Sequence, residues 1–228
     1  KMQITGNVAG WNGWFHNNYG HTIHDHLPGL AWLFQNTDGV ILVLETPVLK
    51  EIIQCVFDPK EIERFVWIPK DTIVQISGSL TVISAPRKNY FPPRFISPLR
   101  QALHIQLAKS TTCKSNTQKN PTVIYYSRNS QKTKHGRKMD TYNEKLVVSE
   151  IQKKMKNWNI PGNVIIFNGM RADGTPMPIK TQIQLFFSAN IVVGPHGSGL
   201  ANIAWMDWSG NSNPQVLEFI CTPQSKAV

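Results

Sequence analysis

The chain has 228 residues, of which 41% are hydrophobic, 17% charged and 10% aromatic. This composition excludes a disordered polypeptide, and the length predicts one large globular domain or two small ones. No apolar run approaches the ~18–20 residues that a membrane-spanning helix needs. The first residues match neither a signal peptide nor a membrane anchor. Membrane association is therefore expected only through a segment absent from this chain.

The net charge of +10 is concentrated in one segment, because residues 86–156 contain 16 Lys and Arg against three acidic residues. Such a basic zone either attracts polyanions and phosphate-bearing ligands or forms a solvated surface and linker. A nucleic-acid partner is not expected, because bases need aromatic side chains on which to stack. Between residues 109 and 140 the aromatic residues are Tyr125 and Tyr126, and both fall in an expected strand.

The three cysteines, Cys55, Cys113 and Cys221, are far apart in the sequence. Their spacing fits neither a disulfide framework nor a zinc site. We interpret them as free thiols, with one disulfide as the alternative. The chain also lacks an Asn-x-Ser/Thr glycosylation acceptor. Both observations favour a reducing compartment.

The first part of the chain mixes helices with strands. Apolar spacing predicts a helix over 19–35, and prolines in first turns predict helices over 47–57 and 98–109. Short runs rich in β-branched and aromatic residues predict strands over 40–44, 65–68, 72–76 and 80–84. The polar segment 111–121 lacks periodicity and is expected to be a linker or exposed loop.

Strands and helices alternate after this segment. We expect strands over 122–126, 164–167, 190–193 and 216–220, and helices over 143–158, 178–188 and 199–206. This alternation predicts a parallel sheet with crossover helices, and such sheets bind ligands at the carboxyl ends of their strands. The expected organisation is an N-terminal α/β domain over 1–110, a linker over 111–121 and a C-terminal domain over 122–228. The abrupt start leaves open that the first domain is truncated there.

The most informative segment is NIVVGPHGSGLAN at residues 190–202. A β-branched run leads into a turn with Gly194, Gly197 and Gly199, and helical spacing follows. A strand, glycine turn and helix together present backbone N–H groups and a positive helix end to a phosphate. His196 lies inside the turn, where it can donate to an anion. The turn is either a cradle for a nucleotide diphosphate or an ordinary glycine-rich turn, since it matches no standard phosphate-loop pattern.

Further motifs fall at the same expected sheet edge. Tyr126-Ser127-Arg128 follows a strand, Asn143-Glu144 opens a helix, and Glu218 lies late in a strand. With Arg137, Gln184 and the glycine turn, this ordered set resembles the family 61 glycosyltransferases. That family includes plant xylosyl- and arabinosyltransferases and animal protein O-GlcNAc transferases of the secretory pathway. The resemblance is strongest over 122–220, and Ser198 replaces the usual alanine of the H-G-A-G core.

The N-terminal part matches the family more loosely, through a helix with H-x-x-x-D before L-P. His21 and Asp25 fill this pattern and share one helix face. Together with His24 and His26, they form an active-site group, a structural cluster or a metal site. A metal site would need a further ligand and supporting partners, which are not evident. For an active site, Asp25 is the expected catalytic base, with His21 or His24 behind it.

The resemblance implies an α/β, GT-B-like fold with two Rossmann-like domains facing a cleft. The C-terminal domain, with its parallel sheet, would hold the nucleotide sugar. The resemblance also implies inversion at the anomeric carbon and no obligatory metal or other cofactor. The sequence has no Asp-x-Asp pair to hold a divalent cation. Arginine, histidine and backbone N–H groups would then neutralise the leaving diphosphate.

The residues expected to bind the donor lie in and around the glycine turn: Arg128, Arg137, Gly194, His196, Gly197, Ser198, Gly199, Asn202 and Glu218. A bidentate arginine suits phosphate oxygens better than lysine does. Arg128 also fits a surface ion pair. Glu218 fits either an acceptor of ribose hydroxyls or a strand-end acid without a ligand.

We therefore expect an enzyme that moves a sugar from a nucleotide donor, of the UDP-GlcNAc or UDP-xylose type, to a hydroxyl of a glycan or glycoprotein. A non-catalytic nucleotide-binding relative with a degenerate acceptor site is the alternative, and the presence of a catalytic base discriminates the two. The sequence does not decide the cellular compartment of the protein. The alternatives are the lumen of the Golgi or ER, where eukaryotic family members work, and the cytoplasm.

Overall fold

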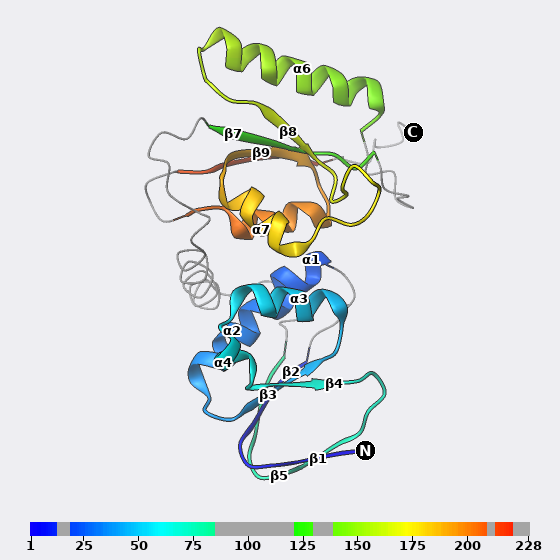
Figure 1. Cartoon of the computed structure of the whole chain (residues 1–228), viewed down its shortest axis with the longest axis vertical. Coiled ribbons are helices and arrows are strands. Elements are labelled where there is room, and N and C mark those ends of the chain that lie inside the picture. Colours follow the sequence, from blue (N-terminus) through cyan, green and yellow to red (C-terminus); the bar gives the residue numbers. More distant parts are fainter. Residues whose placement is uncertain (13–18, 85–120, 130–138, 209–212, 221–228) are drawn as a thin grey trace, which may run out of the picture. The chain divides into compact units, whose positions relative to one another are not determined.

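The computed structural model describes residues 1–12, 19–84, 121–129, 139–208 and 213–220. Outside these residues lie the expected helix over 98–109, all but the last residue of the expected linker, Arg137, Cys113 and Cys221. The chain divides into two compact units, Lys1–Lys114 and Ser115–Val228, which we describe separately (Figure 1). Both units combine helices with parallel sheets, so the expected α/β class is confirmed. No described helix is both long and apolar enough to cross a membrane.

The first unit contains a four-stranded parallel sheet in the order β4-β3-β2-β6. Its strands are β2 (Val8–Asn12), β3 (Val40–Leu44), β4 (Phe65–Ile68) and β6 (Leu80–Ser84). A separate parallel pair joins β1 (Met2–Thr5) to β5 (Val74–Ser77). The sequence analysis placed β3, β4 and β6 correctly and began β5 two residues early. It assigned no strand to β1 or β2, which are short, and β2 contains glycine and asparagine, residues that disfavour strands.

A helical segment and two further helices accompany this sheet. The segment joins α1 (Tyr19–His21), the π-helical turn η1 (Thr22–His26) and α2 (Leu27–Asn36), and it is followed by α3 (Pro47–Val56) and α4 (Pro59–Ile62). Thr46 caps α3 by accepting a hydrogen bond from the Leu49 N–H at 3.2 Å, with a proline in the first turn. The apolar residues Leu27, Leu30, Ala31 and Leu33 of α2 are buried, and Phe34 is partly buried.

The second unit contains a four-stranded parallel sheet in the order β10-β9-β7-β8. Its strands are β7 (Thr122–Tyr126), β8 (Val164–Phe167), β9 (Ala189–Pro195) and β10 (Gln215–Phe219). They are connected by α6 (Thr141–Asn157), α7 (Ile179–Phe187) and the 3₁₀ helix η2 (Ser198–Trp205). The predicted parallel sheet with crossover helices is therefore confirmed.

Helices cover both faces of this sheet, with α6 on one face and α7 and η2 on the other (Figure 1). Under α6, Tyr125, Val148 and Val193 form a buried cluster. On the opposite face, the rings of Phe167 and Phe186 meet edge to face, with centroids 4.9 Å apart. Because successive residues of a strand point to opposite faces, Tyr125 and Tyr126 contribute to different layers. This alternation directs Tyr126 toward the glycine turn.

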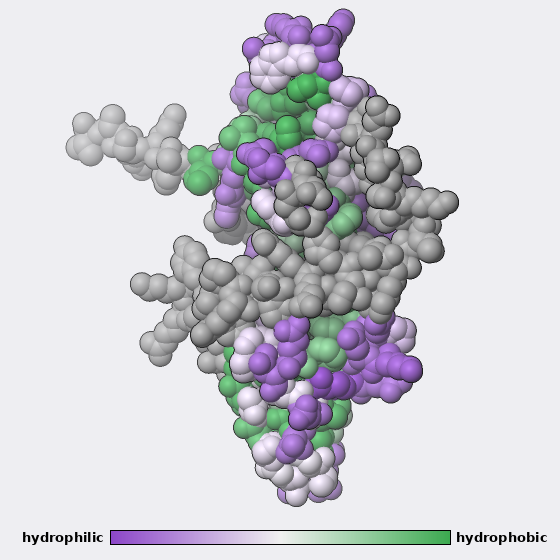
Figure 2. All heavy atoms as spheres, turned by 90° about the vertical axis from the view of Figure 1, so that its left-hand side faces the viewer, coloured by the Kyte–Doolittle hydropathy of each residue, from purple (hydrophilic) through white to green (hydrophobic). Residues whose placement is uncertain are grey.

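The outer strands of the second sheet are its least covered part. Ile166 of β8 and Leu217 of β10 are more than half exposed. Apolar surface is visible among hydrophilic side chains on the face drawn in Figure 2. The sheet is therefore buried mainly along its central strands, β7 and β9, whose carboxyl ends form the candidate site.

Arg64 links the end of α2 to the start of β3. Its guanidinium donates to the Phe34 carbonyl at 2.8 Å, to the Thr37 carbonyl and to the Gly39 carbonyl at 3.0 and 3.1 Å. It also lies over the Phe34 ring, 4.6 Å from the centroid. A planar fork of donors is suited to several carbonyls in one loop. Arg64 therefore holds the helical segment against the sheet.

Replacing Arg64 with methionine should lower the free energy of unfolding by about 2–3 kcal/mol, because carbonyls lose charged donors. Arg64→Lys should recover only part of the loss, since one ammonium group cannot reproduce the fork. Denaturant unfolding of the whole chain measures both variants. Lys60→Met, at an exposed position of α4, is the control. Equal stability of Arg64→Met and Lys60→Met would contradict the assigned role.

Candidate functional site

The histidine–aspartate motif of the first unit spans the end of α1, with His21, and the π-helical turn η1, with Asp25. The Leu27 N–H donates to the Thr22 carbonyl, five residues earlier, in place of the four-residue spacing of an α-helix. Pro28 explains this widening, because it has no N–H for the His24 carbonyl and its ring crowds that oxygen. The sequence analysis expected an ordinary helix here. The proline is the signal that would have predicted the irregular turn.

His21 and Asp25 face each other across this turn, as their spacing predicted. The distance from His21 Nδ1 to Asp25 Oδ2 is 2.5 Å, and the Asp25 side chain is only 7% exposed. A nearly buried carboxylate needs such a polar partner. His26 is buried, whereas His24 is exposed. The structure therefore joins His21 to Asp25 and leaves His24 beside the pair at the surface.

The glycine turn of the second unit packs against Tyr126, the last residue of β7. A Cβ on Gly194 would lie 2.7 Å from both the Cβ and the carbonyl oxygen of Tyr126, and a Cβ on Gly199 would lie 2.3 Å from its ring. The Gly199 N–H also donates to the Tyr126 hydroxyl at 3.3 Å. The sequence analysis left open whether these glycines form a diphosphate cradle or an ordinary glycine-rich turn. Packing within the protein already requires glycine at these two positions.

Arg128 lies against the third glycine of the turn. Its Nη1 donates to the His196 carbonyl, and a Cβ on Gly197 would lie 2.3 Å from that nitrogen. Its Nε is buried and has no hydrogen-bond partner among the described residues. A buried N–H group without a partner is rare and costs free energy. The guanidinium is thus held at the turn with part of its hydrogen-bonding capacity unused.

His196 and Glu218 meet at the ends of β9 and β10. The distance from His196 Nδ1 to Glu218 Oε1 is 2.7 Å, and the side chains are 58% and 37% exposed. The parallel register explains the contact, because Glu218 pairs with Gly194 and the His196 N–H continues the ladder to the Phe219 carbonyl at 3.0 Å. The sequence analysis placed both residues at one edge but did not predict that they contact each other.

The helix after the turn differs from the expected α-helix. It is a 3₁₀ helix, and its first bond runs from the Leu200 N–H to the Gly197 carbonyl at 2.9 Å. Asn202 explains the tighter winding, because its fully buried side-chain amide donates to the Gly199 carbonyl at 3.0 Å. The same amide donates to Gln182 of α7 at 3.2 Å. Asn202 therefore stabilises the turn from within the protein. Ser198, the first residue of η2, is exposed.

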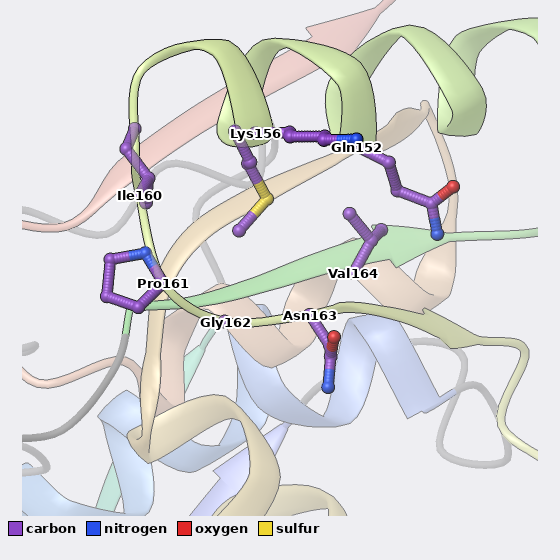
Figure 3. Close-up of a pocket in the computed structure, with 8 residues that line it drawn as sticks. Gln152, Lys156, Ile160, Pro161, Gly162, Asn163 and Val164 are labelled. Carbon is purple, nitrogen blue, oxygen red and sulfur yellow. The ribbon is translucent and has the colours of Figure 1, made fainter.

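A hollow of about 390 Å³ lies elsewhere in the second unit, at the C-terminal end of α6 (Figure 3). In Figure 3, Gln152 and Lys156 extend from α6, and Val164 points toward that helix from β8. Val164 is the first residue of β8, so the hollow lies at the amino-terminal edge of the sheet. The glycine turn lies at the opposite, carboxyl-terminal edge, where parallel sheets bind ligands. This hollow is therefore separate from the candidate site.

No group of three or more His, Cys, Asp or Glu residues is placed to hold a metal ion in the part of the chain that the structure describes. The donors gathered at the carboxyl edge of the second sheet are instead Arg128, His196 and backbone N–H groups. Arginine, imidazolium and backbone N–H groups are the donors that bind anions. The geometry thus defines an α/β protein in which Arg128, His196 and Glu218 lie together at the carboxyl edge of a parallel sheet.

Comparison with known proteins identifies the family. The family model described as Glycosyltransferase 61 matches residues 19–209, so the chain belongs to the glycosyltransferase 61 family. No match was found among the curated proteins. Among solved structures, the chain is similar to the dodecameric iron-containing heptosyltransferase TibC in complex with ADP-D-beta-D-heptose, with 12% sequence identity and a TM-score of 0.48. That similarity covers 96% of this chain and 59% of the other, so the chain spans less than two thirds of its length.

The pKa of His24 should be measurably low. Although the His24 side chain is exposed, the protein around it still removes part of its surrounding water, which lowers its pKa below 6.5. The charge of Asp25 opposes this shift, and that of His21 adds to it. His24 therefore contributes stability that is present above pH 6.5 and is lost as the pH falls through its folded pKa. NMR titration, assigned with His24→Gln, should give a midpoint below 6.5. Asp25→Asn should lower it further, and a midpoint at or above 6.5 would contradict this account.

Proposed function

We propose that this chain transfers a sugar, with inversion, from a nucleotide donor to a hydroxyl of a glycan or protein, and that the second unit binds the donor diphosphate. The observation that supports this most directly is the buried Nε of Arg128 at the glycine turn, which has no hydrogen-bond partner in the part of the chain that the structure describes. Family membership supports sugar transfer in general. The location at the carboxyl edge of a parallel sheet is the usual place for a nucleotide.

Arg128 is proposed to bind the diphosphate directly. One of its nitrogens already bonds to the turn, so the side chain is near its final place before a ligand arrives. A diphosphate at the turn would offer several charged oxygens, and a small rotation of the guanidinium would satisfy the remaining N–H groups. The anion would thus remove the cost of the unpartnered donor. We propose that Arg137, which lies outside the described residues, assists from the following loop.

His196 and Glu218 are proposed to act as a pair on the donor. When Glu218 accepts the proton on Nδ1 of His196, Nε2 of the ring is directed away from the carboxylate. A protonated ring can then donate from Nε2 to a phosphate oxygen. The second oxygen of Glu218 can accept from a ribose hydroxyl, as acids do in many nucleotide-binding folds. Gly194, Gly197 and Gly199 shape the turn at which the donor is proposed to bind. We propose that Ser198 donates its backbone N–H to the diphosphate.

Asp25 is proposed to be the catalytic base and His21 its partner. An inverting transfer needs one base that accepts the proton of the attacking hydroxyl. The 2.5 Å contact with His21 would fix the carboxylate and leave its other oxygen for the acceptor. His24 is the alternative base, because it is exposed and its lowered pKa favours the neutral, proton-accepting ring. The same contact and the low exposure of Asp25 also favour the second candidate function, a non-catalytic nucleotide-binding relative.

The reaction is proposed to need no divalent cation, and the donor to be of the UDP-GlcNAc or UDP-xylose type. The sequence has no Asp-x-Asp pair, and Arg128 and His196 supply positive charge that a cation would otherwise provide. Assays of the variants below are therefore designed in excess EDTA. A loss of activity in EDTA that Mn²⁺ restores would count against this part of the proposal.

Arg128→Lys should weaken UDP binding roughly tenfold, about 1.4 kcal/mol, although the charge is retained. The reason is that an ammonium group cannot bond to the turn and the phosphates in one plane. Isothermal calorimetry with UDP measures the affinity. Arg171→Lys is the matched control, because Arg171 is exposed and its charge is likewise retained. Unchanged affinity in folded Arg128→Lys would show that the diphosphate does not bind there.

Asp25→Asn should lower turnover by ~10²–10⁴, the usual scale for a lost general base, with UDP affinity nearly unchanged. Product release from UDP-sugars measures turnover, and Asp38→Asn, at an exposed position of the first unit, is the control. Normal turnover of Asp25→Asn with an inactive His24→Ala would move the base to His24. UDP binding without turnover in the unmodified chain, across the UDP-sugars tried, would favour the non-catalytic relative.

A further inference from the structure

A polar network lies behind Arg128, on the side away from the glycine turn. The residues on either side of Arg128 are both anchored. The Ser127 N–H donates to the Phe167 carbonyl at 2.8 Å and so extends the pairing of β7 with β8. The Asn129 side-chain amide donates to Glu144 Oε2, and the Asn129 N–H donates to Ser127 Oγ at 3.3 Å. The backbone at Arg128 is therefore fixed from both sides.

Glu144 also contacts the strand that precedes this turn. The hydroxyl of the fully buried Tyr125 donates to Sδ of Met139 at 3.8 Å, and the Glu144 carboxylate lies close enough to this hydroxyl to influence its pKa. Burial raises the pKa of Tyr125 to about 12, and the nearby charge of Glu144 adds to this effect. The phenol is thus neutral at ordinary pH and acts as a donor. The Glu144 carboxylate therefore accepts a hydrogen bond from Asn129, at one end of the Tyr125–Asn129 segment, and lies near the Tyr125 hydroxyl at the other.

The position of Glu144 is itself fixed by the start of α6. Asp140 caps that helix by accepting from the Asn143 N–H at 2.9 Å. A carboxylate in the first helical turn is favoured by the helix dipole. Val148, one turn later, packs into the cluster with Tyr125 and Val193. In the Asn143-Glu144 motif, Asn143 therefore belongs to the cap, and Glu144 is the residue that faces β7.

We propose that Glu144 is a positioning residue, which holds the Tyr125–Asn129 segment so that the Arg128 guanidinium is in place at the glycine turn before the donor binds. This inference rests on the proposed function, because it assigns Glu144 to the same diphosphate site. Its physical basis is preorganisation: a flexible arginine in a loose turn must lose conformational entropy on binding, and an anchored one loses less. Glu144 thus acts through Arg128 and makes no contact with the donor.

The test is a double-mutant cycle of Glu144→Ala and Arg128→Ala, with UDP affinity measured by calorimetry. Glu144→Ala alone should weaken binding by about tenfold, whereas in the Arg128→Ala background it should have almost no further effect. Glu144→Gln, which keeps an acceptor for Asn129, should recover most of the affinity. Glu150→Ala, on an exposed part of the same helix, is the control.

The outcomes separate the two proposals. If Arg128→Ala binds UDP normally, the proposed diphosphate site is wrong, and the role of Glu144 falls with it. If Arg128→Ala weakens binding while Glu144→Ala does not, the site stands and the positioning role is overturned. Additive losses would also overturn it, because they indicate a direct contact with the donor or a general structural effect. Where Glu144→Ala does not fold, Glu144→Asp replaces it in the same cycle, since its shorter side chain withdraws the carboxylate from Asn129.

Discussion

The close approach of the glycine turn to Tyr126 is the constraint on which the second unit depends. The parallel pairing of β7 with β9 brings the turn over the Tyr126 ring, and side chains at Gly194 and Gly199 would occupy the same space as that residue. The approach is what places the His196 carbonyl within reach of Arg128. Arg128 follows β7 and His196 follows β9, so this approach brings two separate segments into contact. A packing requirement thereby assembles the chemical groups of the site.

A comparable constraint acts in the first unit, where one missing N–H decides the local geometry. Pro28 leaves the preceding helical turn without its ordinary bond, and the backbone widens into η1. Within that turn, His21 and Asp25 still meet, and the carboxylate is almost removed from water. The helical segment is held at its other end by Arg64. An irregular helical turn is a common setting for functional side chains.

Membership of the glycosyltransferase 61 family relates the glycine turn of the second unit and the His21–Asp25 pair of the first to one kind of reaction. The second unit presents an arginine and a histidine, and the first presents a paired carboxylate. Under the proposed function, these would be the two kinds of group that sugar transfer from a nucleotide requires. Each has a protein partner already in place: a carbonyl for Arg128, Glu218 for His196 and His21 for Asp25. Such partners orient side chains before any substrate arrives, which reduces the entropy lost on binding.

The sequence by itself predicted the α/β class, most strands, the contact of His21 with Asp25 and the sheet edge where Arg128, His196 and Glu218 gather. Periodicity and i, i+4 spacing are local properties, so they can be read directly. Only the tertiary structure decided that Tyr126 requires the glycines, that Glu218 contacts His196 and that Asn202 tightens η2 into a 3₁₀ helix. The contacts of Tyr126 with the glycines and of Glu218 with His196 join residues whose neighbours are set by strand order and register, which sequence spacing does not specify.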